Sequence, residues 1–356
     1  MRIVQIIDSL EIGGAERMAL NYANELCNKI SFSGLIATRK EGNLKLQLDS
    51  RVNYLFLKKK RTIDLSAVLR LRAYCKAHDV QFLHTHSSSY VSGLLVKLIY
   101  PKIRIIWHDH NGLSEFLSSR KVISLKIASF FFKGIIVVNY QLKNWAENKL
   151  YCKDVIYIPN FTSYATSSTS ESCLKGEQGK RILCLANLRW QKNHFMLIKV
   201  AERLSLSHPS WSFHLVGKDF KDEYSKKLGE IIVVKNLTRS VFLYGSKNDA
   251  FNIINQSDIA VLTSESEGLP VVLLEFGINK KPVVMTNVGE IPMIIKDKNN
   301  GILVPSNDDK QFYDALVALI DNPNLREQIG NALHSTIIKN HSADAIINKY
   351  LSWVKK

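Results

Sequence analysis

The sequence predicts an α/β protein built from two Rossmann-like domains that face a cleft. Short apolar runs alternate with segments of helical periodicity, a pattern typical of parallel βαβ units covered on both faces. The alternation stops at one polar stretch and then starts again. The length of 356 residues suits two domains, each large enough to bury its own core.

The first block begins with a β-rich run and continues as strand and helix in turn. Periodic apolar residues such as Met18, Tyr22 and Leu26 define its first helix. We expect strands at 2–7, 34–38, 52–57, 81–85, 103–107 and 134–138, and helices at 15–28, 65–78, 90–99 and 122–132.

The second block repeats the pattern after a Ser/Thr-rich stretch with few large apolar residues, which predicts a linker. Strands are expected at 181–186, 212–216, 241–244, 259–262 and 283–286, and helices at 195–205, 223–232, 248–255 and 270–279. The expected division is an N-terminal Rossmann-like domain at 1–162, a linker at 163–179, a C-terminal Rossmann-like domain at 180–340, and a C-terminal helix at 341–356 that packs back on the N-terminal domain.

Composition excludes several classes of protein. A hydrophobic content of 46% and a charged content of 22% exclude a disordered or collagen-like chain. The five cysteines are widely spaced and odd in number, which favours a reducing cytoplasm over a disulfide framework. Asp8 and Glu11 interrupt the N-terminal apolar run, so no signal peptide is predicted. No apolar stretch approaches the ~20 residues of a membrane-spanning helix.

The net charge of +16 is concentrated in the N-terminal half. Residues 1–160 hold 24 Lys and Arg against 12 Asp and Glu, a net +12, whereas residues 161–356 hold 24 against 20, a net +4. An anionic partner is therefore expected, and composition alone leaves open a phospholipid surface, a phosphorylated acceptor or nucleic acid.

The most specific motif lies at 264–282 and contains two carboxylates. Glu267 follows an expected strand, and Gly268, Leu269 and Pro270 lead into the next helix, whose first N–H groups can bind a diphosphate. Glu275 lies inside that apolar helix, where a carboxylate needs a partner and can orient a ligand hydroxyl. The alternative for a lone Glu is a solvated position on an amphipathic helix.

This segment resembles the donor-binding signature of the family 4 retaining glycosyltransferases of the GT-B fold. The resemblance rests on Ser-x-x-Glu-Gly-x-Pro-x-x-x-x-Glu, on the later Gly289, and on matches at 12–17, 185–194 and 300–304. It implies that Glu267 lies near the transferred sugar and that Glu275 binds the nucleotide ribose.

Two loops that follow strands have the composition of phosphate-binding loops. Gly13 and Gly14 lack Cβ atoms, so backbone N–H groups can approach a ligand closely. Arg189 and Lys192 suit a diphosphate leaving group, whose charge grows as the glycosidic bond breaks; the alternative is a solvated basic turn. Many family members carry Arg where this chain has Asn187, so we expect Arg189 to supply the guanidinium.

Histidines gather after two neighbouring strands. His84 and His86 end one expected strand, and His108, His110 and Asn111 follow the next. We expect His108 and His110 to point to opposite faces, which argues against one metal ion bound by both. The resemblance implies that one histidine hydrogen-bonds the transferred sugar; His110 fits better than His108, and His84, His86, His108 and Asn111 are assigned to the acceptor side or the cleft.

Two basic segments are candidates for contact with an anionic membrane. Arg120, Lys121 and Lys126 accompany apolar residues on a basic helical segment expected at 118–132, as in an interfacial helix; an ordinary core-facing helix is the alternative. The second segment is the run at 58–61, which is more often a solvated loop.

The resemblance therefore implies an enzyme that moves a sugar from a nucleotide diphosphate sugar to a saccharide or polyprenyl-diphosphate-linked acceptor with retention of configuration. It also implies capsule, O-antigen or exopolysaccharide synthesis at the inner face of the plasma membrane. No cofactor and no metal are expected, because the chain has no Asp-x-Asp, and no nucleic-acid motif appears. The alternatives are a nucleotide-sugar epimerase on the same fold and a non-enzymatic protein that binds anionic ligands.

Overall fold

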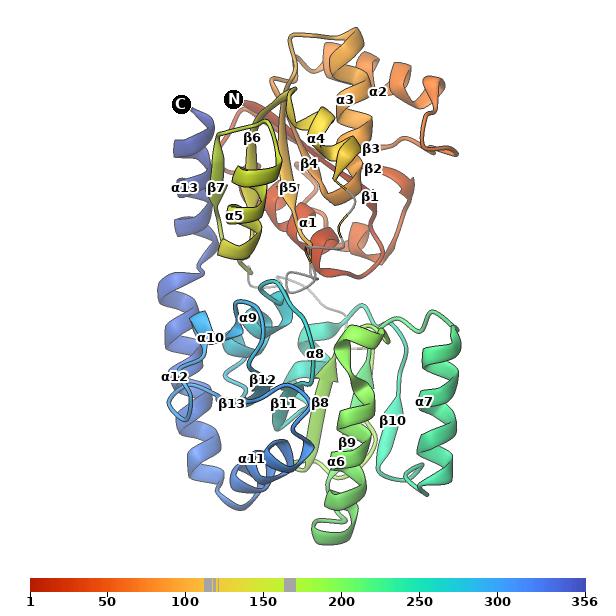
Figure 1. The fold of residues 1–356 in the computed structure, drawn as a ribbon, viewed down its shortest axis with the longest axis vertical. Coiled ribbons are helices and arrows are strands. Elements are labelled where there is room, and N and C mark those ends of the chain that lie inside the picture. Colours follow the sequence, from red (N-terminus) through yellow and green to blue (C-terminus); the bar gives the residue numbers. More distant parts are fainter. Residues whose placement is uncertain (112–116, 118–119, 121, 163–170) are drawn as a thin grey trace. The chain divides into compact units, whose positions relative to one another are not determined.

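The computed structural model describes residues 1–111, 117, 120, 122–162 and 171–356. The chain divides into two compact units, one made of residues 1–163 and 342–356 and the other of residues 164–341 (Figure 1). Each unit contains one parallel sheet with helices on both faces, so the predicted pair of Rossmann-like domains is confirmed.

The first unit holds a seven-stranded sheet with the order β3-β2-β1-β4-β5-β6-β7. Its strands are β1 (Arg2–Ser9), β2 (Phe32–Lys40), β3 (Asn53–Phe56), β4 (Phe82–His86), β5 (Arg104–Asp109), β6 (Phe132–Val137) and β7 (Val155–Tyr157). Its helices are α1 (Gly14–Leu26), α2 (Leu65–Ala77), α3 (Tyr90–Ile99), α4 (Ile123–Ser129), α5 (Tyr140–Lys149) and α13 (Ala343–Val354).

Alternation along β1 sends side chains to two different cores. Val4 and Ile6 pack with residues of α2 and α3, whereas Ile7 packs with residues of α1 on the opposite face. Helix α13 joins the α1 side, because the ring of Tyr350 lies edge-on to that of Tyr22 at 5.1 Å. A Cβ atom at Gly134 would lie 2.4 Å from the Trp353 ring, so this close approach of α13 requires glycine.

The second unit holds a six-stranded sheet with the order β10-β9-β8-β11-β12-β13. Its strands are β8 (Arg181–Leu185), β9 (Ser212–Val216), β10 (Val241–Leu243), β11 (Ile259–Leu262), β12 (Val283–Thr286) and β13 (Ile302–Val304). Its helices are α6 (His194–Ser207), α7 (Glu223–Val234), α8 (Ala250–Asn255), α9 (Val271–Ile278), α10 (Ile291–Ile294), α11 (Asp309–Asp321) and α12 (Pro323–Asn340).

Both sheets have the strand order that creates a topological switch point. The chain reverses direction across the sheet between β1 and β4 in the first unit and between β8 and β11 in the second. Open α/β sheets bind ligands beyond the carboxyl ends of the strands at such a point. Each unit therefore contains one expected binding position.

The stretch predicted as a linker is partly a packed segment. Residues 163–170 lie outside the described residues. The residues from Glu171 up to the start of β8 have no regular structure. The backbone N–H groups of Glu171 and Ser172 nevertheless donate to the Asp249 carboxylate, and Leu174 is buried in the second core. Composition alone could not reveal these contacts with a residue 77 positions away.

Candidate active site

The candidate site in the second unit is built from the loops that follow β8 and β11. Lys192 ends the turn after β8, and its ammonium group forms an ion pair with the carboxylate of Glu267, which follows β11. Ser264 donates a second hydrogen bond of 2.7 Å to the same carboxylate oxygen. Glu267 is buried, so its charge is compensated by a cation and a hydroxyl.

Backbone contacts fix these two loops together. The hydroxyl of Thr263 donates to the carbonyl groups of Lys192 and Asn193, at 2.9 and 3.0 Å. Gly289 approaches the second loop so closely that a Cβ atom there would lie 2.2 Å from the Glu267 carbonyl oxygen, and its φ is +56°. A side chain at 289 would displace the loop that carries Glu267 and Gly268.

Glu275 is buried inside α9, and Gly268, Leu269 and Pro270 lead into that helix as expected. The helix begins at Val271, so Pro270 is its N-cap and not its first residue. The first N–H groups of a helix lack partners within it and can bind an anion.

Arg189 is not part of the ion-paired cluster. Its guanidinium lies over the ring of Phe220, 4.6 Å from the ring centre, and the side chain is exposed. In the turn after β8, the cation that contacts Glu267 is therefore Lys192 and not Arg189.

In the first unit, Gly13 is the N-cap of α1 and Gly14 is its first residue, after the loop that follows β1. A Cβ atom at Gly14 would meet no atom within 4 Å, and one at Gly13 would meet only the flexible carboxylate of Glu16. Neither residue has a positive φ. Packing in this unit does not require these two glycines, which fits a close approach of a ligand.

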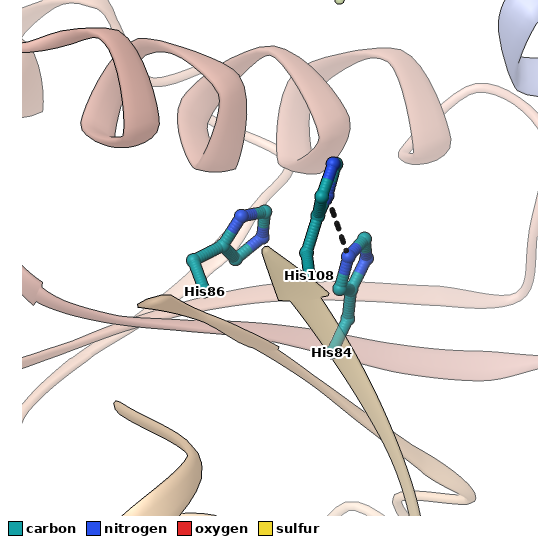
Figure 2. A group of neighbouring side chains, drawn as sticks. All are labelled: His84, His86 and His108. Carbon is teal, nitrogen blue, oxygen red and sulfur yellow. Dashed lines mark hydrogen bonds between the residues drawn. The ribbon is translucent and has the colours of Figure 1, made fainter. Parts of the chain in front are cut away.

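Four histidines lie beside each other on the α1 face of the first sheet. His84 and His86 come from β4, and His108 and His110 come from β5 and the residue after it. Figure 2 shows three of these rings and the contact between His84 Nε2 and His108 Nδ1, which are 3.1 Å apart. The expectation that His108 and His110 point to opposite faces is wrong, because residues two apart along a strand share a face; their ring centres are 3.9 Å apart.

Burial keeps this cluster neutral. It lowers the pKa values of His84, His86 and His108 well below the ordinary value, and that of His110 to about 3. His84, His86 and His108 are fully buried, whereas His110 and Asn111 are partly exposed. His110 is therefore the histidine of this group that can reach a ligand.

His84, His86 and His108 are close enough together to be considered as metal ligands, since one nitrogen from each lies within 4.8 Å of the others. His84 Nε2 and His108 Nδ1 are however paired with each other. Both ring nitrogens of His86 are also engaged in hydrogen bonds, to Gln5 and His110.

Two contacts near the histidines, those of Arg120 and Gln5, are not predicted from the sequence. Arg120 binds both oxygens of the buried Asp109 carboxylate, at 2.6 and 3.0 Å. Arg120 is therefore turned inward, toward Asp109. The apolar pattern of the first strand could have identified Gln5 as a candidate site residue, because it is a polar residue within an apolar strand.

Known protein families match nearly the whole length of this chain. The family model described as Glycosyltransferase Family 4 matches residues 12–164, and the model described as Glycosyl transferases group 1 matches residues 167–335. The chain is 25% identical to an uncharacterised glycosyltransferase of Haemophilus influenzae, over 90% of both chains. It is 24% identical to the UDP-Gal:alpha-D-GlcNAc-diphosphoundecaprenol alpha-1,3-galactosyltransferase of Escherichia coli, over 95% of both.

Solved structures agree on the fold. The crystal structure of HepE from Anabaena in complex with UDP and glucose matches with a TM-score of 0.81 at 17% identity, over 100% of both chains. The structure of TarM, a protein of S. aureus, matches with a TM-score of 0.80 at 16% identity, over 100% of this chain and 99% of that one.

Proposed function

Because the chain belongs to the family 4 glycosyltransferases of the GT-B fold, we propose that it transfers a sugar from a nucleotide diphosphate sugar with retention of configuration and without a metal ion. The acceptor is a saccharide or a polyprenyl-diphosphate-linked saccharide. The alternatives, an epimerase or a non-enzymatic binding protein, have no comparable support among the relatives.

The observation that carries this proposal is the ion pair of Lys192 and Glu267 at the switch point between β8 and β11. In the donor complex, the Lys192 ammonium group balances the charge that grows on the diphosphate as the glycosidic bond breaks. Glu267 then lies beside the transferred sugar, and Glu275 accepts hydrogen bonds from the ribose hydroxyls. A cation held by a carboxylate is ready to bind the diphosphate before the donor arrives.

His110, in the first unit, is the histidine proposed to contact the transferred sugar. As a neutral imidazole it offers one hydrogen bond to a hydroxyl of the transferred sugar, and this contact matters most as the sugar acquires oxocarbenium character. Gly13 and Gly14 allow backbone N–H groups to approach the donor or the acceptor. Asn111 is assigned to the acceptor side.

The proposed biological role is the synthesis of a bacterial surface polysaccharide. Relatives that match 82–95% of the chain carry names of this kind: a capsular polysaccharide glycosyltransferase of Staphylococcus aureus, an amylovoran glycosyltransferase of Erwinia amylovora and an O-antigen glycosyltransferase of Escherichia coli. The proposed place of action is the cytoplasmic face of the plasma membrane, where lipid-linked acceptors are assembled. Among the described helices, none is both long and apolar enough to cross a bilayer.

The experiment is a turnover assay with a panel of nucleotide sugars and lipid-linked or free saccharide acceptors. We expect nucleoside diphosphate to be released only when the acceptor is present, and this release should persist in EDTA. The proton NMR coupling of the product should show the anomeric configuration of the donor. An epimerase would convert the nucleotide sugar into its epimer without an acceptor and without net release of nucleoside diphosphate, and a binding protein would do neither. An inverted linkage would contradict the assigned donor site.

A further inference from the structure

A chain of hydrogen bonds runs from the first strand to His110. The side-chain oxygen Oε1 of Gln5, on β1, lies 2.8 Å from His86 Nε2, on β4. The other ring nitrogen of His86, Nδ1, lies 2.8 Å from Nε2 of His110. Gln5 and His86 are fully buried, so the hydrogen bond between them is shielded from bulk water, whereas His110 at the end of the chain of hydrogen bonds is partly exposed.

The amide oxygen determines where each proton lies. An amide oxygen only accepts, so His86 Nε2 carries the hydrogen that it donates to Gln5. A neutral imidazole has one N–H group, which leaves His86 Nδ1 as an acceptor for the Nε2–H of His110. Burial keeps both rings neutral, since it lowers their pKa values. His110 Nδ1 is then the bare nitrogen.

We propose that Gln5 and His86 are positioning residues that fix His110 in the Nε2–H tautomer and present its Nδ1 as an acceptor for a hydroxyl of the transferred sugar. This inference rests on the proposed function of His110. It specifies which sugar group is recognised: a hydroxyl that donates its hydrogen, and not an ether or carbonyl oxygen.

Ring packing holds the chain in this geometry. The rings of His86 and His110 are stacked with centres 5.1 Å apart, and His108 packs against His110 from the same strand region. His108 itself pairs with His84 through Nδ1, so it does not compete for the contact between His86 and His110. The register of β1, β4 and β5 thus sets the position of His110 through side chains that do not reach the ligand.

The direct test reads the tautomer without any assay of turnover. The full chain is labelled with ¹⁵N-histidine, and long-range ¹⁵N–¹H spectra distinguish the protonated from the bare ring nitrogens. The signals of two of the ten histidines are assigned by their loss in His110→Ala and His86→Asn. We expect protonated Nε2 and bare Nδ1 for both residues. The opposite tautomer at His110 would overturn the inference, whatever the activity of the enzyme.

A variant series then tests the positioning role. The Asn side chain mimics Nδ1 of histidine, and the Gln side chain mimics Nε2. His86→Asn keeps an acceptor toward His110, whereas His86→Gln and His86→Leu do not. We expect kcat to fall about tenfold in the Gln and Leu variants and to be largely restored in the Asn variant, with an unchanged KM for the donor.

Thr85→Val is the matched control, because Thr85 is equally buried on β4 but faces the other side of the sheet and hydrogen-bonds the Ile106 carbonyl. It should keep kcat, and thermal unfolding reports whether each variant is folded. Equal kcat values for folded His86→Asn and His86→Leu would overturn the positioning role. Wild-type kcat in His110→Ala with the expected tautomer would instead contradict the proposed function of His110.

Discussion

At the scale of single residues, the structure separates His110 from His108. His110 is partly exposed, whereas His108 is fully buried and paired with His84. His110→Ala should lower kcat about ten- to a hundredfold while the affinity for the donor changes little, because the lost contact strengthens toward the transition state. Steady-state kinetics with thermal unfolding as a control measure this. Loss of turnover in a folded His108→Ala variant, with near-normal His110→Ala, would shift the assignment by two residues.

Charged residues mark the boundary of what the sequence could predict. The motif at 264–275 and Lys192 were identified as one donor site, and the structure joins Lys192 to Glu267. Arg120 and Lys59 were expected among exposed basic residues, yet Arg120 binds Asp109, and the buried Lys59 donates to Ser92 Oγ at 2.9 Å. A sequence gives the charge of a side chain but not the partner that its loop brings near.

At the scale of elements, α4 remains a candidate for membrane contact, on a smaller set of residues than expected. Its exposed apolar residues are Ile123, Ile127 and, just after the helix, Phe130, with exposed fractions of 76%, 59% and 75%. Lys126 lies on the same helix, while Lys121 falls outside the described residues. Apolar side chains beside a cation suit the interface of an anionic bilayer.

We expect the protein to sediment with vesicles that contain anionic lipid, not with zwitterionic vesicles, and to be released by high salt, since each Lys or Arg contributes ~1 kcal/mol near such a surface. Ile127→Ser with Phe130→Ser should weaken binding several-fold. The matched control is Leu206→Ser, at an exposed apolar residue of α6. Sedimentation that is equally absent from both vesicle types at low salt would favour a soluble anionic acceptor.

Element boundaries show how far local periodicity predicts the ends of helices and strands. Strands and helices with strong periodicity, such as β1 and α1, were placed within a few residues. The helix expected at 122–132 ends at Ser129, because Phe132 already belongs to β6 and is buried beside Trp107. Tertiary packing determines where such a helix ends, and the local periodicity of the sequence carries no information about that packing.

At the scale of the whole molecule, both units use the same strand order and carry their functional loops at the same place. The Gly13 loop follows β1, the histidines lie in β4, in β5 or directly after β5, and the Lys192 and Glu267 loops follow β8 and β11. Strand alternation predicted both sheets, because βαβ units leave a clear pattern of apolar runs. The histidine chain to Gln5 was not predicted, since it depends on the register between strands far apart in sequence.

The central claim is that the loops after β8 and β11 bind the donor diphosphate, and calorimetric titration of nucleoside diphosphates tests it without knowledge of the acceptor. The nucleotide that binds the wild-type chain should bind Lys192→Ala and Glu275→Ala about ten- to a hundredfold more weakly, because each loses a charge-assisted contact of ~1.5–3 kcal/mol. Lys227→Ala, at an exposed lysine of α7, should bind like the wild type. Unchanged affinity in both site variants, with folding intact, would contradict the account.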